Sequence, residues 1–428
     1  MSSKKKTTAT KEEATPALVP KLRFPEFRGA EGWPQMRLID TADRSVKWSF
    51  IGGPFGSNLK SSDYAPDGVR IIQLQNIGDG EFFNEYQIFT TPEKADELLS
   101  NNIYPGEIIM SKMGDPVGRA CLIPKGHDRY VMCSDGIRLV VDEKENVKYF
   151  IYSLINSPLF RAVVEKTATG STRKRIGLDE LKSLPMWLPK KSEQQKIAEC
   201  LSSVDELMAA QARKVDALKT HKKGLMQQLF PREGETQPRL RFPEFQNAGD
   251  WEVKPLGRAA ENLDNRRRPI TSSDRVAGDV PYYGASGIVD YVEGFVFDED
   301  LLCVSEDGAN LVARTYPIAF PISGKTWVNN HAHVLRFANP CTQKFVEVYL
   351  NSIKLDDFIT GMAQPKLNKA MLDKIPIPYP DVHEQQRIAD CLTSLDDLLA
   401  AQTQKLDALK THKKGLMQQL FPSPEGMP

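Results

Sequence analysis

Four side chains in the second half of the sequence have the types and spacing of a metal-dependent hydrolytic site. Glu306 and Asp307 are adjacent carboxylates, and His331 and His333 alternate along an expected strand. Carboxylate and imidazole groups are common ligands of catalytic divalent metals. The sequence supplies no third ligand beside the two histidines. A stand-alone metal-dependent nuclease is therefore only an alternative, and we expect neither a bound metal nor a catalytic residue.

Motifs of related chemistries are missing from the sequence. It contains no G-x-x-x-x-G-K-[ST] phosphate loop, and the segment 114–119 does not substitute for one. It also lacks the Asn/Asp-Pro-Pro-aromatic motif of an adenine methyltransferase. None of the six cysteines forms a C-x-x-C pair, which argues against zinc and against a disulfide framework. We expect this chain to bind no cofactor of its own.

Polar and basic side chains cluster instead in the expected turns of both halves. Arg, Lys, Asn and Gln can make paired hydrogen bonds to base edges, and basic loops neutralise phosphates. The candidate DNA-binding residues of the first half are Ser57, Asn58, Lys60, Gln73, Gln75, Asn76, Lys112, Arg119, Ser171, Arg173, Lys174 and Arg175. Those of the second half are Arg266, Arg267, Arg268, Tyr283, Ser286, Glu306, Asp307, Asn310, Lys325, Asn329, Asn330, His331, His333, Gln364 and Lys366.

The overall charge neither supports nor excludes this interpretation. The 56 basic and 56 acidic residues give a net charge of zero, which argues mildly against a nonspecific polyanion binder. A DNA-binding protein can still gather its basic side chains on one face. Any single short charged run is more often a solvated surface, so the candidates depend on the framework that positions them.

That framework is present twice. Residues 20–27 and 238–245 both read P-[KR]-L-R-F-P-E-F, and a tryptophan follows each copy at the same distance. A longer block, residues 193–231, returns as residues 384–422 with roughly 30 of 39 positions identical. The interior of the first unit is 27 residues longer than that of the second and unlike it in sequence. A duplicated frame around two unlike inserts explains this better than a drifted tandem duplication, whose substitutions would spread more evenly.

Each long repeated block has the periodicity of a coiled-coil helix. Its seam positions recur at alternating steps of four and three over about five heptads, a stripe narrower than the face of a globular helix. Such a helix needs a partner, and the other copy is the nearest candidate, packed parallel or antiparallel. An antiparallel pair would give the chain an approximate twofold axis. The predicted seam comprises Ile197, Leu201, Val204, Met208, Gln211, Val215, Leu218, Leu225, Leu229, Ile388, Leu392, Leu395, Leu399, Gln402, Leu406, Leu409, Leu416 and Leu420.

The inserts mix short strands with helices. Residues 70–74, 107–110 and 137–141 are predicted strands, and residues 149–166 and 342–358 are predicted helices. The proline-punctuated segments 184–189 and 375–380 exclude helix and central strand, so we expect stiff extended connectors.

We therefore expect an α/β (α+β) fold, in which two globular domains are joined by two long antiparallel coiled-coil helices with pseudo-twofold symmetry. The expected boundaries are a disordered tail (1–19), a first domain (20–191), a central spacer helix (192–231), a second domain (232–382), a C-terminal spacer helix (383–422) and a tail (423–428). The sequence has no apolar run of 18 residues and no secretory signal, so a cytoplasmic location without membrane contact is expected.

The combination of repeats and inserts resembles a known family. Residues 52–60 (G-G-P-F-G-S-N-L-K) resemble one class of target recognition domain, and residues 282–287 with 324–333 (Y-Y-G-A-S-G and G-K-T-W-V-N-N-H-A-H) strongly resemble another. Together with the P-x-L-R-F-P-E-F openings and the E-Q-Q-[KR]-I-A helix starts, they make almost the whole chain similar to the specificity (S) subunits of Type I restriction–modification systems.

This resemblance implies a function for each part of the chain. Each target recognition domain would read one half of a bipartite asymmetric site in double-stranded DNA, and the helices would set the unread spacer between the halves. Two methylation (M) subunits using S-adenosylmethionine and motor–nuclease (R) subunits using ATP and Mg²⁺ would be the partners. The chain itself would be non-catalytic. The other alternative is a coiled-coil scaffold that binds only proteins.

Overall fold

The computed structural model describes residues 17–171, 173–232, 234–361 and 364–422. The chain divides into two compact units, Met1–Ala210 with Leu406–Pro428 (unit 1) and Gln211–Lys405 (unit 2). Most of the two predicted tails, residues 1–16 and 423–428, lies outside the described residues. Leu18 exchanges two backbone hydrogen bonds with Trp33, at 3.1 and 2.7 Å. The predicted disorder is therefore wrong at Leu18.

Unit 1 is built on two main sheets. The five-stranded sheet has the order β3 (Tyr64–Ala65), β5 (Ile88–Thr90), β4 (Val69–Ile72), β10 (Tyr130–Met132) and β6 (Asn102–Ile103). The antiparallel four-stranded sheet has the order β2 (Phe50–Gly52), β11 (Gly136–Leu139), β7 (Ile108–Ser111) and β9 (Ala120–Leu122). A short pair joins β12 (Lys174–Arg175) to β8 (Met113–Gly114). The helices are α1 (Pro92–Glu97), α2 (Lys148–Ile155), α3 (Pro158–Thr167) and α4 (Leu178–Ser183).

The core of unit 1 lies between the four-stranded sheet and the helices α2 and α3. Ile108 and Ile137 of the sheet and Phe150 and Phe160 of the helices are almost wholly buried in one cluster. Leu201 belongs to the same cluster, so the repeated helix that carries it closes the core. A second cluster, which includes Ile72, Ile109 and Met132, joins the two sheets to each other.

Unit 2 contains two four-stranded sheets. The first has the order β15 (Glu261–Asn262), β22 (Ala332–Arg336), β19 (Leu301–Ser305) and β20 (Ala319–Ile322). The second has the order β17 (Gly287–Val292), β16 (Ala277–Gly284), β21 (Lys325–Val328) and β18 (Phe297–Asp298). The helices are α6 (Leu256–Ala259), α7 (Asn310–Ala313), α8 (Pro340–Ser352) and α9 (Lys369–Leu372).

Both predicted helices and all three predicted strands have different bounds in the structure, where the strands expected over 107–110 and 137–141 run over Ile108–Ser111 and Gly136–Leu139. The helix expected over 149–166 is two helices, because Pro158 lacks an N–H and disfavours helical geometry at Ser157. The Ser157 hydroxyl accepts a hydrogen bond from Phe160 N at 3.3 Å and so caps α3. The helix expected over 342–358 ends at Ser352. The strand expected over 70–74 ends at Ile72, because residues 74–76 form a 3₁₀ turn.

The proline-punctuated segments are extended, as predicted, and each pairs with a second strand. β13 (Pro185–Trp187) pairs antiparallel with β1 (Gln35–Arg37), and β23 (Pro376–Tyr379) pairs antiparallel with β14 (Glu252–Pro255). Each of these sheets has two strands, so every strand is an edge strand and can accommodate proline, which cannot donate a hydrogen bond. The predicted extended conformation and the exclusion of helix and central strand are therefore confirmed.

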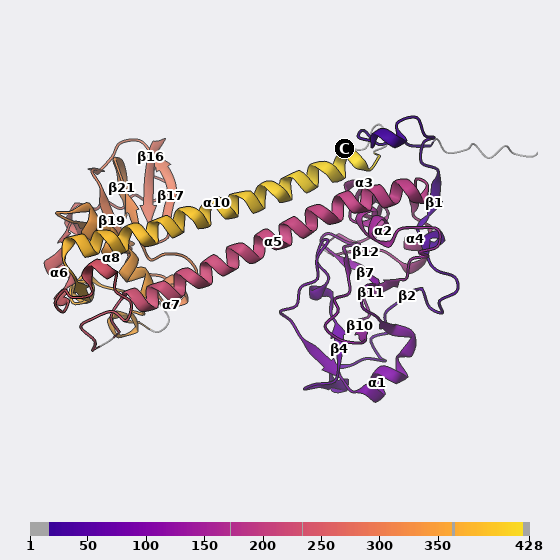
Figure 1. Cartoon of the computed structure of the whole chain (residues 1–428), viewed down its shortest axis with the longest axis horizontal. Coiled ribbons are helices and arrows are strands. Elements are labelled where there is room, and N and C mark those ends of the chain that lie inside the picture. The colour runs from indigo at the N-terminus through magenta and orange to yellow at the C-terminus, as the bar shows by residue number, and fades with distance from the viewer. Residues whose placement is uncertain (1–16, 172, 233, 362–363, 423–428) are drawn as a thin grey trace, which may run out of the picture. The chain divides into compact units, whose positions relative to one another are not determined.

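The two repeated blocks form the continuous helices α5 (Lys191–Leu229) and α10 (Val382–Leu420) (Figure 1). In unit 1, Asp205 of α5 pairs with Lys413 of α10 at 2.6 Å. In unit 2, Lys222 of α5 pairs with Asp396 of α10. The later residue of α5 thus pairs with the earlier residue of α10. The two helices therefore pack antiparallel, as predicted. The predicted seam residues are all buried or half-buried.

The same contacts fasten the start of a long helix in each unit. In unit 1, Arg23 donates two hydrogen bonds to the Glu193 carboxylate at 2.7 and 2.6 Å, and Trp33 Nε1 donates a third at 3.4 Å. In unit 2, Arg241 donates to both oxygens of Glu384 at 2.7 Å, and Trp251 Nε1 donates at 3.2 Å. Each arginine comes from a P-x-L-R-F-P-E-F segment and each glutamate from an E-Q-Q-[KR]-I-A helix start. We call these two clusters the helix anchors.

The ends of the long helices are also bound in equivalent ways. Leu22 N donates to Gln419 O at 2.9 Å in unit 1, and Leu240 N donates to Gln228 O at 2.9 Å in unit 2. Phe421, after α10, packs edge-on against Trp33, and Phe230, after α5, packs against Phe345 of α8. The two repeats therefore form one frame in duplicate. Within the described part of the chain, no helix is long and apolar enough to cross a membrane.

Candidate nucleic-acid interface

In unit 1 the candidate residues lie on loops at one end of the strands. The loop 53–60 follows β2 and is held against the turn 133–136, where Gly53 N donates to Gly136 O at 2.7 Å. A Cβ on Gly53 would lie 1.7 Å from the carbonyl oxygen of Cys133, so only glycine allows this approach. Ser57, Asn58 and Lys60 are exposed on the loop. These backbone contacts thus fix the loop that carries the exposed polar side chains.

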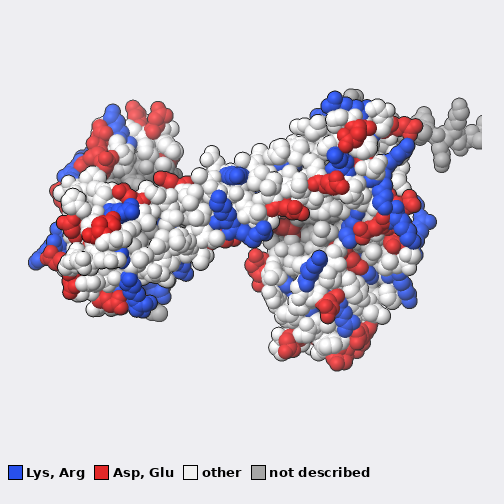
Figure 2. All heavy atoms as spheres, in the orientation of Figure 1, with Lys and Arg blue, Asp and Glu red and all other residues white. Residues whose placement is uncertain are grey.

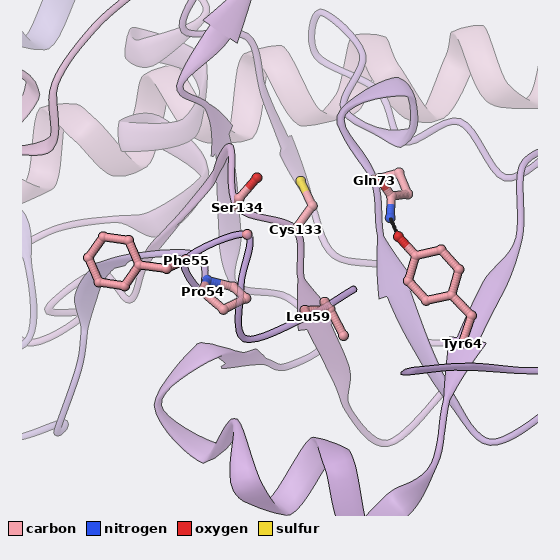
Figure 3. Close-up of a pocket in the computed structure, with 8 residues that line it drawn as sticks. Pro54, Phe55, Leu59, Tyr64, Gln73, Cys133 and Ser134 are labelled. Atoms are coloured by element: carbon pink, nitrogen blue, oxygen red, sulfur yellow. Dashed lines mark hydrogen bonds between the residues drawn. The ribbon is translucent and has the colours of Figure 1, made fainter. Parts of the chain in front are cut away.

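The tip of this loop carries an exposed aromatic ring that the sequence reasoning missed. The side chain of Phe55 is 83% exposed, and its ring points away from the other labelled side chains (Figure 3). Behind it is a cavity of about 70 Å³, beside which the Gln73 amide donates to the Tyr64 hydroxyl at 3.4 Å. Small-molecule sites usually occupy about 300 Å³ or more, so this cavity is too small for such a ligand.

A basic group adjoins the loop through Asp135. Lys112 N donates to Asp135 O at 2.7 Å, and the Arg175 guanidinium pairs with the Asp135 carboxylate at 3.1 Å. Because residues 133–136 also hold the loop 53–60, the two groups are neighbours. We define the unit 1 surface as these neighbouring candidates: Ser57, Asn58, Lys60, Gln73, Gln75, Lys112, Arg119, Ser171, Arg173, Lys174 and Arg175.

One first-half candidate is not on this surface. Asn76 is fully buried, where its side chain accepts from Gln73 N at 2.9 Å and donates to the carbonyls of Phe83 and Tyr86 at 2.8 Å. All of these partners are backbone groups of the same unit. The prediction that Asn76 contacts DNA is therefore wrong, and its amide instead fixes the turn that presents Gln75.

In unit 2 the candidates gather where several loops meet. Glu306 N donates to His331 O at 2.8 Å, and Leu367 N donates to Glu306 O at 2.7 Å, which brings three segments together. Asn329 is buried, and its side chain accepts from His331 N at 2.8 Å. We define the unit 2 surface as the candidates that are exposed or half-buried at this junction: Arg268, Tyr283, Ser286, Asp307, Asn330, His331, Gln364 and Lys366. Arg266 is not among them, because its guanidinium pairs with Glu299 at 3.0 Å and lies over the Phe297 ring of β18.

Lys325 does not join this group. It begins β21, whose last residue, Val328, leads to the junction. Its ammonium group lies 5.0 Å from the centre of the Phe295 ring. The sequence placed Lys325 near Asn329 and Asn330, but the extended strand separates them.

Beneath the unit 2 surface lies a buried ionic network. His333 is 1% exposed, and its two ring nitrogens lie 2.6 Å from Asp264 Oδ2 and 2.7 Å from Leu367 O. Arg267 binds Glu306 at 2.7 Å and approaches Asp264 at 3.4 Å. These four side chains link the loop 264–268 to β19, β22 and the segment that follows residue 363.

Neighbouring cations keep both carboxyl groups of the network ionised. Burial alone would raise the pKa of Asp264, but its hydrogen bond to His333 and the charges of His333 and Arg267 hold that pKa below its ordinary value. Burial opposes ionisation of Glu306 in the same way, but its interactions with Arg267, His333 and Lys366 together outweigh burial, so its pKa is also lowered. Each carboxylate of the network is therefore compensated by neighbouring positive charge.

This network corrects several sequence predictions. His333 is buried and Arg267 is committed to Glu306 and Asp264, so both position the surface and neither is free for DNA. Asn310 is also buried, and its side chain bonds to backbone groups of Thr315 and Tyr316. The DNA-contact predictions for His333, Arg267 and Asn310 are therefore wrong, and Glu306 shares their structural role.

The structure also changes the interpretation of the possible metal ligands. The two histidines have separate partners, since His331 pairs with Asp307 at 2.7 Å while His333 binds Asp264. Asp264, Glu306 and His333 offer ligand atoms within 4.8 Å of one another, a grouping that the sequence missed because Asp264 is distant in the chain. The Arg267 guanidinium already neutralises this group. The arrangement therefore does not favour metal-dependent hydrolysis.

Charge is mixed over the molecular surface. On the face shown in Figure 2, basic and acidic side chains are interspersed over both units. This agrees with the zero net charge of the sequence. Selective contacts at the two surfaces therefore fit the charge distribution better than one broad basic field.

Comparison with known proteins identifies the family. Residues 71–220 and 248–411 match the family described as Type I restriction modification DNA specificity domain. The chain belongs to this family. The two matched regions include the loops of both surfaces except 53–60, and most of both long helices. Membership of the DNA specificity family assigns DNA recognition to the chain, and the family is known as the non-catalytic part of its complexes.

Curated relatives and solved structures agree with this assignment. The chain is 39% identical over 147 residues to a putative type I restriction enzyme specificity subunit of Haemophilus influenzae, a match that covers 34% of this chain and 38% of that protein. It is 23% identical over 377 residues to the putative MjaX specificity subunit of Methanocaldococcus jannaschii, covering 83% and 86% of the two chains.

Among solved structures, the S subunit of a Type I restriction-modification system from M. genitalium has a similar fold. Its TM-score is 0.58 at 18% identity, and the match covers 95% of this chain and all of that chain. A chain from a study of complex assembly in the type I R-M system has a TM-score of 0.55 at 14% identity, covering 91% and 98%. The expected fold class, two α/β domains joined by long antiparallel helices, is confirmed.

Proposed function

We propose that the unit 1 surface and the unit 2 surface each read one half of a bipartite, asymmetric DNA site. The observation that carries this proposal is the contrast between two equivalent helix anchors and two unlike surfaces. The two copies of the frame can hold the two domains in equivalent ways. The loops of the two surfaces differ, so they can select different bases. Exposed Asn, Gln and Arg side chains, such as Gln75, Asn330 and Arg268, supply the base-edge donors and acceptors.

The proposed domain boundaries follow from this division of labour. Residues 20–191 and 232–382 are target recognition domains, and residues 192–231 and 383–422 are spacer segments that consist almost wholly of α5 and α10. The helices set the length of DNA left unread, with half-site centres near one helical turn, roughly 34–36 Å apart. An approximate twofold axis relating the two repeats is part of the same proposal.

The repeated frame also provides two like docking positions for two methylation subunits. Those subunits would bring S-adenosylmethionine, and motor–nuclease subunits would bring ATP and Mg²⁺. This chain would contribute DNA specificity and no cofactor. Since its proposed DNA and ATP-dependent partners are cytoplasmic in a bacterial or archaeal cell, we place the chain there.

Selection from random DNA tests the proposal. The full chain, alone and with its methylation subunits, is mixed with a random duplex library, and bound duplexes are sequenced. We expect two short unlike motifs at a fixed separation. Enrichment of no motif in either condition would favour a protein-binding scaffold. Metal-dependent cleavage by the purified chain alone would favour a nuclease.

Changing the length of the helices tests the spacer role separately. One heptad is inserted after Ala210 and a matching heptad after Ala401, close to where Gln211 contacts Gln402. The gap between the motifs should lengthen while both motifs keep their sequences, because the recognition loops are untouched. A change in either half-site sequence would contradict the proposed separation of spacing from base reading.

A further inference from the structure

Arg70 is a buried cation without a carboxylate partner in the described part of the chain. Three arginines of the described chain are at least nine-tenths buried, namely Arg23, Arg70 and Arg138. Arg23 and Arg138 each bind both oxygens of a glutamate. Arg70 is 2% exposed and forms none of the ion pairs found among the described residues. Burying an uncompensated charge is costly, and the counter-charge of Arg70 is missing from the described residues.

The hydrogen bonds of Arg70 do not replace that charge. Its guanidinium donates to the side-chain oxygen of Asn84 and to the carbonyls of Asn84 and Tyr86, at 3.3 and 3.1 Å for the two carbonyls. These acceptors are uncharged, and Nε has no acceptor within the described structure. The centre of the Phe82 ring lies 5.2 Å from the guanidinium carbon. This ring offers the cation only the attraction of its quadrupole and no negative charge. Burial accordingly lowers the pKa of Arg70.

A cavity of about 450 Å³ adjoins this arginine. Arg70 lies on β4 directly opposite Tyr130 on the parallel strand β10, and the cavity lies where these strands begin. Gln87 and His127 add polar groups to its wall. The unit 1 surface, by contrast, lies beyond the other ends of β4 and β10, at Gln73 and Ser134. The cavity is thus separate from the proposed DNA-reading loops, and its volume is typical of a small-molecule site.

We infer that this cavity binds a phosphate group of a small molecule, which supplies the missing counter-charge of Arg70. The donors come from different walls: the guanidinium from β4, the Gln87 amide from the segment before β5, and the His127 ring from the loop before β10. A tetrahedral anion can accept from donors in several directions, whereas a planar carboxylate favours one plane. The rings of Phe82 and Tyr130 provide apolar wall for the remainder of the ligand.

Titration calorimetry of the purified full chain with inorganic phosphate, at constant ionic strength, tests this inference. We expect saturable binding to one site with a dissociation constant of about 1 mM or lower. Arg70→Met should weaken it by about tenfold or more, because an apolar side chain replaces the cation. The matched control is Arg44→Met, which removes a cation whose side chain is 84% exposed in the same unit, and it should leave phosphate binding unchanged.

A second variant blocks the cavity without altering the arginine. A Cβ on Gly126 would lie 3.5 Å from the Tyr130 hydroxyl, an ordinary contact, so Gly126→Leu should fold and fill the rim. It should also abolish phosphate binding, with the wild-type melting temperature retained in buffer without phosphate. Saturable binding that survives Gly126→Leu, absence of binding to the wild type, or equally tight binding of acetate would each overturn the inference.

Binding to DNA distinguishes the source of the phosphate. The inference concerns a free phosphate-bearing molecule and does not depend on the proposed function, because calorimetry is done without DNA. Duplex affinity should therefore be the same for Gly126→Leu and the wild type. An equal loss of affinity for every duplex would place a backbone phosphate in the cavity and overturn the small-molecule source.

Discussion

The helix anchors and the two candidate surfaces differ in what the duplication has kept. Arg23 with Glu193 and Arg241 with Glu384 make the same bidentate contacts in their respective units. The surfaces share no comparable arrangement. The unit 1 surface is built on a loop held by backbone contacts and tipped by the exposed Phe55, whereas the unit 2 surface lies over the ionic network that includes His333.

This contrast has a physical reason. Changing one member of a buried ion pair leaves the other charge uncompensated, at a cost of about 3–5 kcal/mol. Exposed loop side chains can usually change at a cost within about 0.5 kcal/mol. The anchors thus constrain both copies of the frame alike, while the surfaces are free to diverge toward different DNA sequences.

The largest effect expected is at the anchors. Glu193→Gln and Glu384→Gln should each destabilise the unit concerned by about 3–5 kcal/mol, because a buried arginine loses its counter-charge. Urea denaturation combined with hydrogen exchange would locate the loss in unit 1 or unit 2. Glu199→Gln, on the exposed side of α5, is the matched control and should be neutral. Destabilisation by only one of the two anchor variants would contradict their energetic equivalence.

A smaller, pH-dependent effect should be confined to unit 2. Asp264→Asn should cost about 2–4 kcal/mol near neutral pH, because His333 and Arg267 lose a charged partner. The folded-state pKa of Asp264 is lowered, so its contribution is complete above the unfolded pKa and is lost as pH falls through the folded value. The difference between wild type and variant should therefore shrink as the pH falls below about 4, the ordinary pKa of an aspartate. Urea titrations at several pH values measure it, and a difference independent of pH would refute the charge-based explanation.

Base discrimination sharpens the comparison between the surfaces. Gln75→Ala and Asn330→Ala should each relax preference at one position by about 1–3 kcal/mol, and in different half-sites. Selection and sequencing with each variant provides the measurement. Lys325→Ala is the control, since Lys325 begins β21 away from the unit 2 surface. If both variants lost base preference in the same half-site, the assignment of one half-site to each unit would be wrong.

The smallest effect concerns the seam glutamines, which are equivalent in sequence but not in contacts. Gln211 Nε2 donates to both the backbone and side-chain oxygens of Gln402, at 2.8 and 3.0 Å. Gln402→Leu leaves the backbone acceptor in place and should change the unfolding free energy by less than about 0.5 kcal/mol. Gln211→Leu removes both bonds and should cost about 1 kcal/mol. If thermal melts gave the same change in unfolding free energy for the two variants, the difference in contacts would make no difference to stability.

Sequence reasoning succeeded where a pattern extends over many residues. The heptad spacing from Ile197 to Leu229 predicted a long helix, and the helix is present. It failed where the outcome depends on one residue or on distant partners. Pro158 divides a predicted helix in two, and Asn76 and His333 are buried although their types suit DNA contact. Nothing in the local sequence distinguishes such a buried polar side chain from an exposed one.

The sequence by itself determined the repeated frame, its helical periodicity and the family, because repeats and heptads are properties of residue order. The tertiary structure alone decided which polar residues reach the surface. Asp264 meets His333 across 69 positions, and Arg70 is buried beside a cavity with no carboxylate to pair it among the described residues. These outcomes depend on which strands and loops become neighbours, and burial then decides whether a charge must be compensated inside the protein or can remain in water.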